Sequence, residues 1–223
     1  ESEHLKIGYD RPIMEITMRI KRGQKIGILG KNGVGKTTFL KTAAGFLPPF
    51  SGEYQIGNQV TIGYFDQNSA QIQSEKTVLE HFHELFPSMT EKDVRQTLGA
   101  YLFGGKDAAK KVSSLSGGEK SRLVLAELLQ SRPNFLILDE HTAALDPRTA
   151  EIVMKLTDQI VREKKMTTVM VTHNLRYALE YGDRILMMHQ GKIVLDKVGE
   201  EKNRLNTDEI MGIFNRISVE CGN

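Results

Sequence analysis

Residues 30–38 of this 223-residue chain read Gly30-Lys31-Asn32-Gly33-Val34-Gly35-Lys36-Thr37-Thr38. The stretch matches the phosphate-binding pattern G-x-x-x-x-G-K-[ST]. Its glycines let the backbone curl so that successive N–H groups point at an anion. Lys36 adds a mobile positive charge for the outer phosphates, and the Thr37 hydroxyl can ligate Mg²⁺. The stretch therefore predicts a nucleotide-phosphate site.

The residues on either side strengthen this prediction. Residues 26–29 form an apolar run typical of a buried strand, and residues 38–44 read as the opening of a helix. The loop would then lie at a helix N-terminus, where the dipole favours phosphate. The alternative is a glycine-rich turn that only joins strand to helix, and the complete strand–loop–helix setting disfavours it.

Composition excludes several classes of function. The formal net charge of +2 is nearly balanced, so composition does not point to an anionic membrane, and no direct DNA binding is expected. The single cysteine, Cys221, excludes an internal disulfide framework and suits a reducing compartment. No apolar stretch approaches the about 20 residues that a membrane helix needs, so membrane association is expected to come through a partner.

An aromatic residue precedes the phosphate loop. Residues 5–7 and 13–20 alternate like strands around a break at residues 8–12, and Tyr9 lies in that break. The tyrosine is either an ordinary surface residue or a platform on which a nucleotide base stacks.

A helical insertion is predicted after a strand at residues 60–65. That strand ends near Gln67, which is either a turn residue or a side chain aimed at a metal or a water. Apolar residues then recur at helical spacing from residue 75 to residue 101. We expect a small helical subdomain over about residues 70–130, with Lys110-Lys111 on a solvated face.

A serine and two glycines open a later helix, in the stretch Leu115-Ser116-Gly117-Gly118-Glu119. One interpretation is a flexible helix cap. The other is a second anion site, because the stretch offers a hydroxyl and two exposed N–H groups at a helix N-terminus.

Two carboxylates follow a buried strand. Residues 135–138 are an uninterrupted apolar run, which suits a parallel strand that is buried on both faces. The run ends in Asp139-Glu140, and burying unpaired charge as core filler would be costly. One carboxylate can hold Mg²⁺ through water while its neighbour polarises an attacking water.

The last third of the chain continues in alternating helices and strands. A helix is expected from Asp146-Pro147 to about Lys164, a buried strand over residues 167–171, a hairpin around Gln190-Gly191 and a final helix over residues 206–217. His173 follows the strand and is either a structural histidine or a group that reaches a γ-phosphate.

The order of these motifs resembles that of the ATP-binding cassette (ABC) ATPases over nearly the whole chain. The resemblance implies ATP and Mg²⁺ as cofactors and hydrolysis of ATP as the activity. Tyr9 would stack on the adenine, and Lys36 with the backbone of residues 32–38 would hold the phosphates. Thr37 and Gln67 would ligate Mg²⁺.

The resemblance also implies the catalytic groups. Asp139 would hold Mg²⁺ through water, Glu140 would be the general base, and His173 would sense the γ-phosphate. Gln67 and Lys36 would complete this set.

A homodimer is implied as well. Ser116 and Gly118, with Gly117 and Glu119 of the same motif, would close over ATP bound to a second copy. The active unit would then be a head-to-tail dimer with two composite sites and Asp146 at its interface. The helical insertion supports this arrangement, because one chain cannot easily bring both motifs to the same ATP.

Two kinds of ABC protein are resembled. Through about Leu138 the chain is similar to the F class, whose members are soluble factors acting on the ribosome. The remainder, from His141, is similar to the ATP-binding subunit of a bacterial transporter. The chain is therefore either a natural intermediate between the two classes or a hybrid or chimera of two parents joined near Leu138-Asp139. We expect a transporter subunit that is cytoplasmic and peripheral on the inner face of the membrane through its partner. A ribosome-acting factor or an isolated ABC ATPase module is the alternative.

The expected fold is a single α/β domain over residues 1–223. It would have a P-loop NTPase core with a mostly parallel sheet, an N-terminal antiparallel β subdomain and the small helical subdomain.

Overall fold

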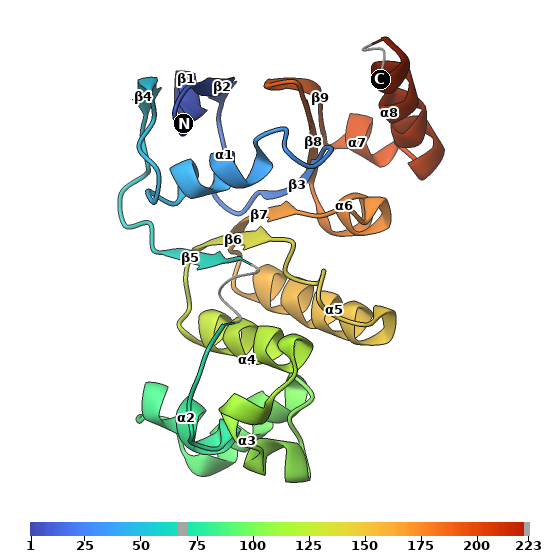
Figure 1. Ribbon diagram of the computed structural model, residues 1–223. Coiled ribbons are helices and arrows are strands. Elements are labelled where there is room, and N and C mark those ends of the chain that lie inside the picture. The colour runs from blue at the N-terminus through green and yellow to red at the C-terminus, as the bar shows by residue number, and fades with distance from the viewer. Residues whose placement is uncertain (67–70, 221–223) are drawn as a thin grey trace. The chain divides into compact units, whose positions relative to one another are not determined.

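The computed structural model describes residues 1–66 and 71–220 (Figure 1). Side chains are described as far as residue 216. The chain forms two compact units. The first contains Glu1–Ile62, Asn134–Asp139 and Lys165–Asn223, and the second contains Gly63–Pro133 and Glu140–Lys164. The chain is mixed α/β, as the sequence predicts.

An antiparallel sheet in the first unit has the strand order β2-β1-β4. Its strands are β1 (Ser2–Gly8), β2 (Pro12–Met18) and β4 (Ser51–Tyr54). The alternating pattern of β1 and β2 buries one face, with Leu5, Ile7, Met14, Ile16 and Met18 in the core. Strand β4 was not predicted from the sequence, because its polar residues are extended through pairing with β1, in which Ser51 is opposite Lys6.

A second sheet in the first unit has the order β6-β7-β3-β8-β9. Its strands are β3 (Lys25–Leu29), β6 (Phe135–Asp139), β7 (Thr167–Val171), β8 (Arg184–His189) and β9 (Lys192–Val198). Pairing is parallel from β6 through β7 and β3 to β8, and β9 returns antiparallel to β8. The continuous apolar runs in β3, β6 and β7 are buried, which confirms the predicted parallel sheet.

The helices of the first unit are α1 (Lys36–Ala43), α6 (Leu175–Tyr181), α7 (Glu200–Asn203) and α8 (Thr207–Glu220). Helix α6 was not predicted from the sequence. It approaches β3 so closely that a Cβ on Gly27 would lie 3.1 Å from the Cβ of Ala178. Asn174 caps this helix by accepting a hydrogen bond from the N–H of Tyr177.

The second unit is mainly helical, and Figure 1 shows α2, α3 and α4 grouped together. Its elements after the strand β5 (Ile62–Phe65) are α2 (Val78–Leu85), α3 (Glu91–Ala100), the 3-10 helices η2 (Gly105–Ala109) and η3 (Val112–Ser114), α4 (Gly117–Gln130) and α5 (Pro147–Glu163). Thr77 and Thr90 cap α2 and α3 through their hydroxyl oxygens. The subdomain boundary at about residues 70–130 stays a prediction.

No helix in the described part of the chain combines the length and the apolar character needed to cross a membrane.

Candidate nucleotide site

The phosphate loop joins the end of β3 to the start of α1. Gly30, Gly33 and Gly35 all have positive φ values, of 152°, 80° and 101°. A Cβ on Gly30 would lie 2.6 Å from the carbonyl oxygen of Met188, so a side chain there would collide with β8. The loop therefore requires glycine for its left-handed backbone and, at Gly30, for close packing as well.

Lys36 is folded back across this loop. Its side chain is 5% exposed, and its Nζ donates to the carbonyl oxygens of Gly30 at 2.8 Å and Lys31 at 3.0 Å. Helix α1 begins at Lys36, two residues before the predicted opening, because Gly35 serves as its left-handed N-cap. The exposed Thr37 follows in the first turn, and Thr38 is buried. The ammonium and the first amides of α1 thus form one positive region at the end of β3.

The ends of three parallel strands bring other predicted residues to the same edge of the sheet. Asp139 at the end of β6 is opposite Val171 of β7, and Val171 is opposite Ile28 of β3. Asp139 is only 6% exposed, whereas His173, just beyond β7, is exposed. In open α/β sheets, ligands bind outside the carboxyl ends of the strands. The phosphate loop, Asp139 and His173 all leave the sheet at that edge.

Tyr9 lies in the turn between β1 and β2 and is 57% exposed. The hairpin reaches the phosphate loop, because a Cβ on Gly35 would lie 3.3 Å from side-chain carbons of both Ile13 and Met14. The ring of Tyr9 is accessible to solvent on a hairpin that contacts the loop. Stacking of this ring on a base stays a prediction.

Gln67 lies outside the described residues. Glu140 is the first residue of the second stretch of the second unit, and its backbone is left-handed with φ 51°. Its carbonyl oxygen accepts a hydrogen bond from the N–H of Ala143 at 2.9 Å. The chain therefore turns at once after β6.

Ser116 to Glu119, which we call the serine–glycine cap, forms the N-terminus of α4. The Ser116 hydroxyl oxygen accepts from the N–H of Glu119 at 3.3 Å, and the Glu119 carboxylate accepts from the N–H of Ser116 at 2.9 Å. This reciprocal pair is a capping box. Partial burial acts to raise the pKa of Glu119, but hydrogen bonds from Ser116 and Lys110 outweigh burial and lower that pKa to about 2. Glu119 is therefore ionised near neutral pH.

The turn after Glu140 packs against this cap. A Cβ on Gly118 would lie 3.1 Å from the carbonyl oxygen of Ala144 and 3.3 Å from a side-chain carbon of Leu145. Asp146 then caps α5, accepting from the N–H groups of Arg148 and Thr149 at 3.1 Å each. Hydrogen bonds from Thr149 are the main reason that the pKa of Asp146 is lowered. An interface role for Asp146 stays a prediction.

His141 belongs to the second unit and is buried. It is 3% exposed, and its ring meets the ring of Phe65 edge-on at a centroid separation of 6.3 Å. Within the described residues, neither ring nitrogen has a hydrogen-bond partner. Burial lowers the pKa of His141 to about 4, so the ring is neutral near neutral pH.

Sequence reasoning missed two contacts around these residues. Ile13 and Met14 were assigned only to a strand, and Lys110 only to a solvated face. Neither contact has a local signal in the sequence, because each depends on segments that come together only in the folded chain.

A glycine-rich loop between a parallel strand and a helix, with a carboxylate at the same sheet edge, defines a P-loop nucleotide-binding protein. Residues 13–143 match the family model described as "ABC transporter". The chain belongs to this family, and it is an ABC ATPase.

This chain covers most of the length of one known relative and about a third of the length of another. A "Tyrosine transport ATP-binding protein" of Clostridioides difficile is 37% identical over 227 residues, covering 89% of each chain. The "Putative ATP-binding protein YdiF" of Bacillus subtilis is also 37% identical, over 194 residues, but the match covers 86% of this chain and only 30% of that protein.

A solved structure supports the same fold. The ATP-binding cassette MJ0796, described as dimeric in a post-hydrolysis state with ADP and Pi, superposes with a TM-score of 0.75 at 25% identity. The match covers 88% of this chain and 97% of that one.

Proposed function

We propose that this chain is the ATP-binding subunit of a membrane transporter, and that it hydrolyses Mg-ATP in the cytoplasm beside a membrane partner. The proposed binding of nucleotide rests on one observation: the phosphate loop, Asp139 and His173 lie at the same edge of the sheet. The near full-length similarity to a tyrosine transport ATP-binding protein supports the transporter part. The membrane partner would select the transported substrate.

Residues of the first unit would bind the nucleotide. Lys36 and the amides of residues 32–38 fit a triphosphate because they present positive charge at the N-terminus of α1. Tyr9 is exposed and would stack on the adenine. His173 is exposed at the sheet edge and would contact the γ-phosphate.

The donor set fits a bound Mg²⁺. The exposed hydroxyl of Thr37 and the carboxylate of Asp139 are oxygen ligands of the kind that Mg²⁺ prefers, and we assign Gln67 as a third. The ion would neutralise charge on the phosphate oxygens. Glu140 would accept the proton of the attacking water.

The serine–glycine cap of one copy would close over ATP bound to a second copy. The capping box holds the Ser116 hydroxyl at the start of α4, and the amides of Gly117 and Gly118 lie in its first turn. An N-terminus of this kind binds anions. ATP would thus hold a head-to-tail homodimer together, and its hydrolysis would release the contact.

The Glu140→Gln variant tests this function. Removal of the general base should lower ATP turnover by about 10²- to 10⁴-fold and leave ATP binding intact. With ATP and Mg²⁺, the variant should elute as a dimer in size exclusion coupled to light scattering, and Lys36→Ala should stay monomeric. A Glu140→Gln chain that binds ATP and remains monomeric would overturn the dimer mechanism.

A soluble factor acting on the ribosome is the second candidate. It rests on the resemblance of residues through about Leu138 to the F class and on the longer relatives, of which this chain spans about a third or less. Co-purification with the closed Glu140→Gln variant separates the two functions. A membrane protein should be recovered if the chain is a transporter subunit, and ribosomal particles if it is a factor. A single relative matches 89% of this chain, so the similarity does not require a hybrid origin.

A further inference from the structure

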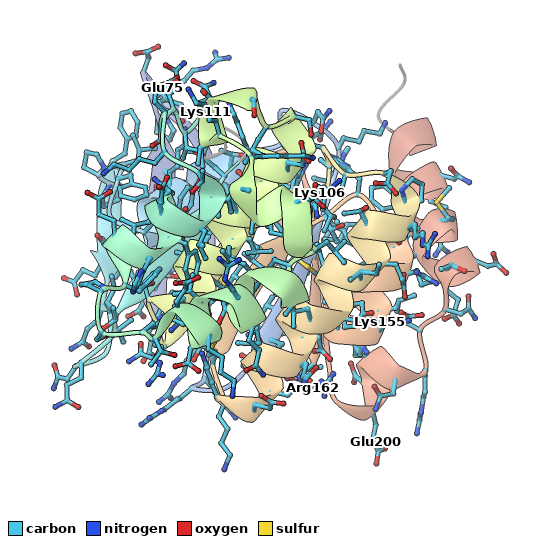
Figure 2. All side chains as sticks on the ribbon, turned by 90° about the horizontal axis from the view of Figure 1, so that it is seen from below. Glu75, Lys106, Lys111, Lys155, Arg162 and Glu200 are labelled. Carbon is cyan, nitrogen blue, oxygen red and sulfur yellow. The ribbon has the colours of Figure 1, made fainter. Side chains whose placement is uncertain are left out.

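Two adjacent lysines before the serine–glycine cap make different ion pairs. The Nζ of Lys110 lies 2.8 Å from a carboxylate oxygen of Asp107 and 2.9 Å from one of Glu119. The Nζ of Lys111 lies 3.0 Å from the carboxylate of Glu75, and Figure 2 shows these two residues side by side. The two side chains therefore connect to separate parts of the second unit.

Glu119 links Lys110 to the cap. One carboxylate oxygen accepts from Lys110, and the other accepts from the N–H of Ser116. A glutamate held at both oxygens has less rotamer freedom than one held only by the capping box. Hydrogen bonds that Lys110 donates to Asp107 and Glu119 correspondingly raise the pKa of Lys110. Lys110 thus restricts the side chain that fixes the backbone of Ser116.

The backbone of Lys110 is anchored as well. Its carbonyl oxygen accepts from the N–H of Val78 at 2.9 Å, in the first turn of α2. The N–H of Val112 donates to Lys76 at 3.0 Å, and the N–H of Ser113 donates to Ser74 at 2.9 Å. Thr77 and Lys111 form an antiparallel bridge between these bonds. Residues 74–78 and 110–113 therefore form a short ladder, which places the base of the Lys110 side chain on fixed backbone.

We infer that Lys110 is a positioning residue for the serine–glycine cap. The ladder fixes the backbone of Lys110, and the Lys110 side chain in turn holds Glu119 in its position in the capping box. The consequence for ATP-driven dimerisation rests on the proposed function, in which the cap closes over ATP of a second copy. The consequence for the cap itself belongs to the monomer and does not depend on that function.

Lys110→Met and Lys111→Met form a matched pair of test variants. Each removes one positive charge from the same ladder, and only Lys110 contacts Glu119. In the monomer, amide hydrogen exchange at Ser116 and Glu119 should be about fivefold faster for Lys110→Met, the size expected for one such contact. Lys111→Met should leave it unchanged. Lys110→Arg keeps the charge and should restore slow exchange.

A thermodynamic cycle with Glu119→Gln completes the test. If Lys110 acts through Glu119, the effects of the two substitutions on amide exchange should not add. Equal exchange in the two methionine variants, or additive effects in the cycle, would overturn the inference.

Dimerisation is measured separately in the Glu140→Gln background with ATP and Mg²⁺. Lys110→Met should weaken the dimer by at least about fivefold relative to Lys111→Met, with binding of ATP to the monomer unchanged. If the Glu140→Gln chain itself never dimerises, that result would count against the proposed function. The role of Lys110 would then be decided by the amide hydrogen exchange of the monomer. A dimer of normal affinity with a loosened cap would overturn the functional part of the inference.

Discussion

The surroundings of Glu127 on α4 disfavour the ionised form of its carboxyl group. Burial raises its pKa to about 7, and its Oε1 lies 3.1 Å from the Nε2 of His81 on α2. Burial also lowers the pKa of His81, while the nearby charges of Glu84 and Lys76 act on it in opposite directions. The two burial effects favour neutral partners over an ion pair. The carboxyl group of Glu127 therefore retains its proton up to a pH of about 7.

This pair predicts a pH dependence of folding stability. Glu127 has a pKa of about 7 in the folded state and an ordinary value of 4.5, so the folded chain holds a proton that the unfolded chain releases between those values. Its stabilising effect is complete below 4.5 and is lost as the pH rises through 7. The free energy of unfolding should fall by up to about 3 kcal/mol over this window.

Glu127→Gln should remove that fall, because the amide keeps a polar group of the same size and does not ionise. Urea unfolding at pH 5 and pH 8 checks the result. The free energy of unfolding of the variant should exceed that of the natural chain at pH 8 and be close to it at pH 5. An equal difference at the two pH values would contradict the assignment.

Among the elements, the phosphate loop depends on close packing at Gly30. Gly30→Ala would put a methyl group 2.6 Å from the carbonyl oxygen of Met188, and β3 or β8 would have to shift. Gly33→Ala is the matched control, since nothing lies within 4 Å of a Cβ there although its φ is also positive. The control should lose about 1 kcal/mol of stability from backbone strain alone.

Gly30→Ala should lose about 1 to 3 kcal/mol more than Gly33→Ala because of the collision. Thermal unfolding of both variants measures the difference, and binding of a fluorescent ATP analogue shows whether the loop still functions. Equal losses would mean that the exit from β3 adapts to a side chain at Gly30.

Elements with a strong local pattern were predictable from the sequence. The helix expected from Asp146-Pro147 is α5, and its predicted end at about Lys164 agrees with Pro147–Glu163. The proline and the capping aspartate mark its start, and a regular apolar face marks its length. The hairpin at Gln190-Gly191 and the final helix were confirmed in the same way. These signals act within a single segment.

Elements that exist through tertiary pairing were not predictable. Strand β4 is exposed and polar, and it is extended because it pairs with β1. The short helix α6 packs against Gly27 from a distant part of the chain. The lysine contacts at the serine–glycine cap depend on the ladder between residues 74–78 and 110–113. At the candidate site, the motifs identified the residues in the sequence. Only the register of the folded sheet shows that Asp139 and the phosphate loop lie at one edge.

For the whole molecule, the proposed function separates ATP binding from dimerisation. Among the described residues, those assigned to hold the nucleotide of one copy lie in the first unit with the exception of Glu140, and the serine–glycine cap lies in the second. Substitutions in these two groups should therefore have different effects in a monomer.

Thermal unfolding of dilute monomer tests this separation. Mg-ATP at about 100 times its Kd should stabilise the chain by about 2.7 kcal/mol. For a chain of this size, Tm should rise by roughly 5 to 10 °C. Lys36→Ala should abolish the rise, and Ser116→Ala should keep it, because in the proposed dimer the cap acts on the ATP of a second copy. Loss of the rise in Ser116→Ala would mean that the cap binds ATP of its own chain.

The close approach of Gly118 to the Ala144 carbonyl leaves almost no free space between the serine–glycine cap and the turn that begins at Glu140. In the proposed dimer, these neighbours serve opposite ATP molecules. If the turn moved during hydrolysis of one ATP, it would displace the serine–glycine cap, which in the proposed dimer contacts the other ATP. The two turnovers would then be cooperative, and the chain would hydrolyse its ATP in a correlated pair of events.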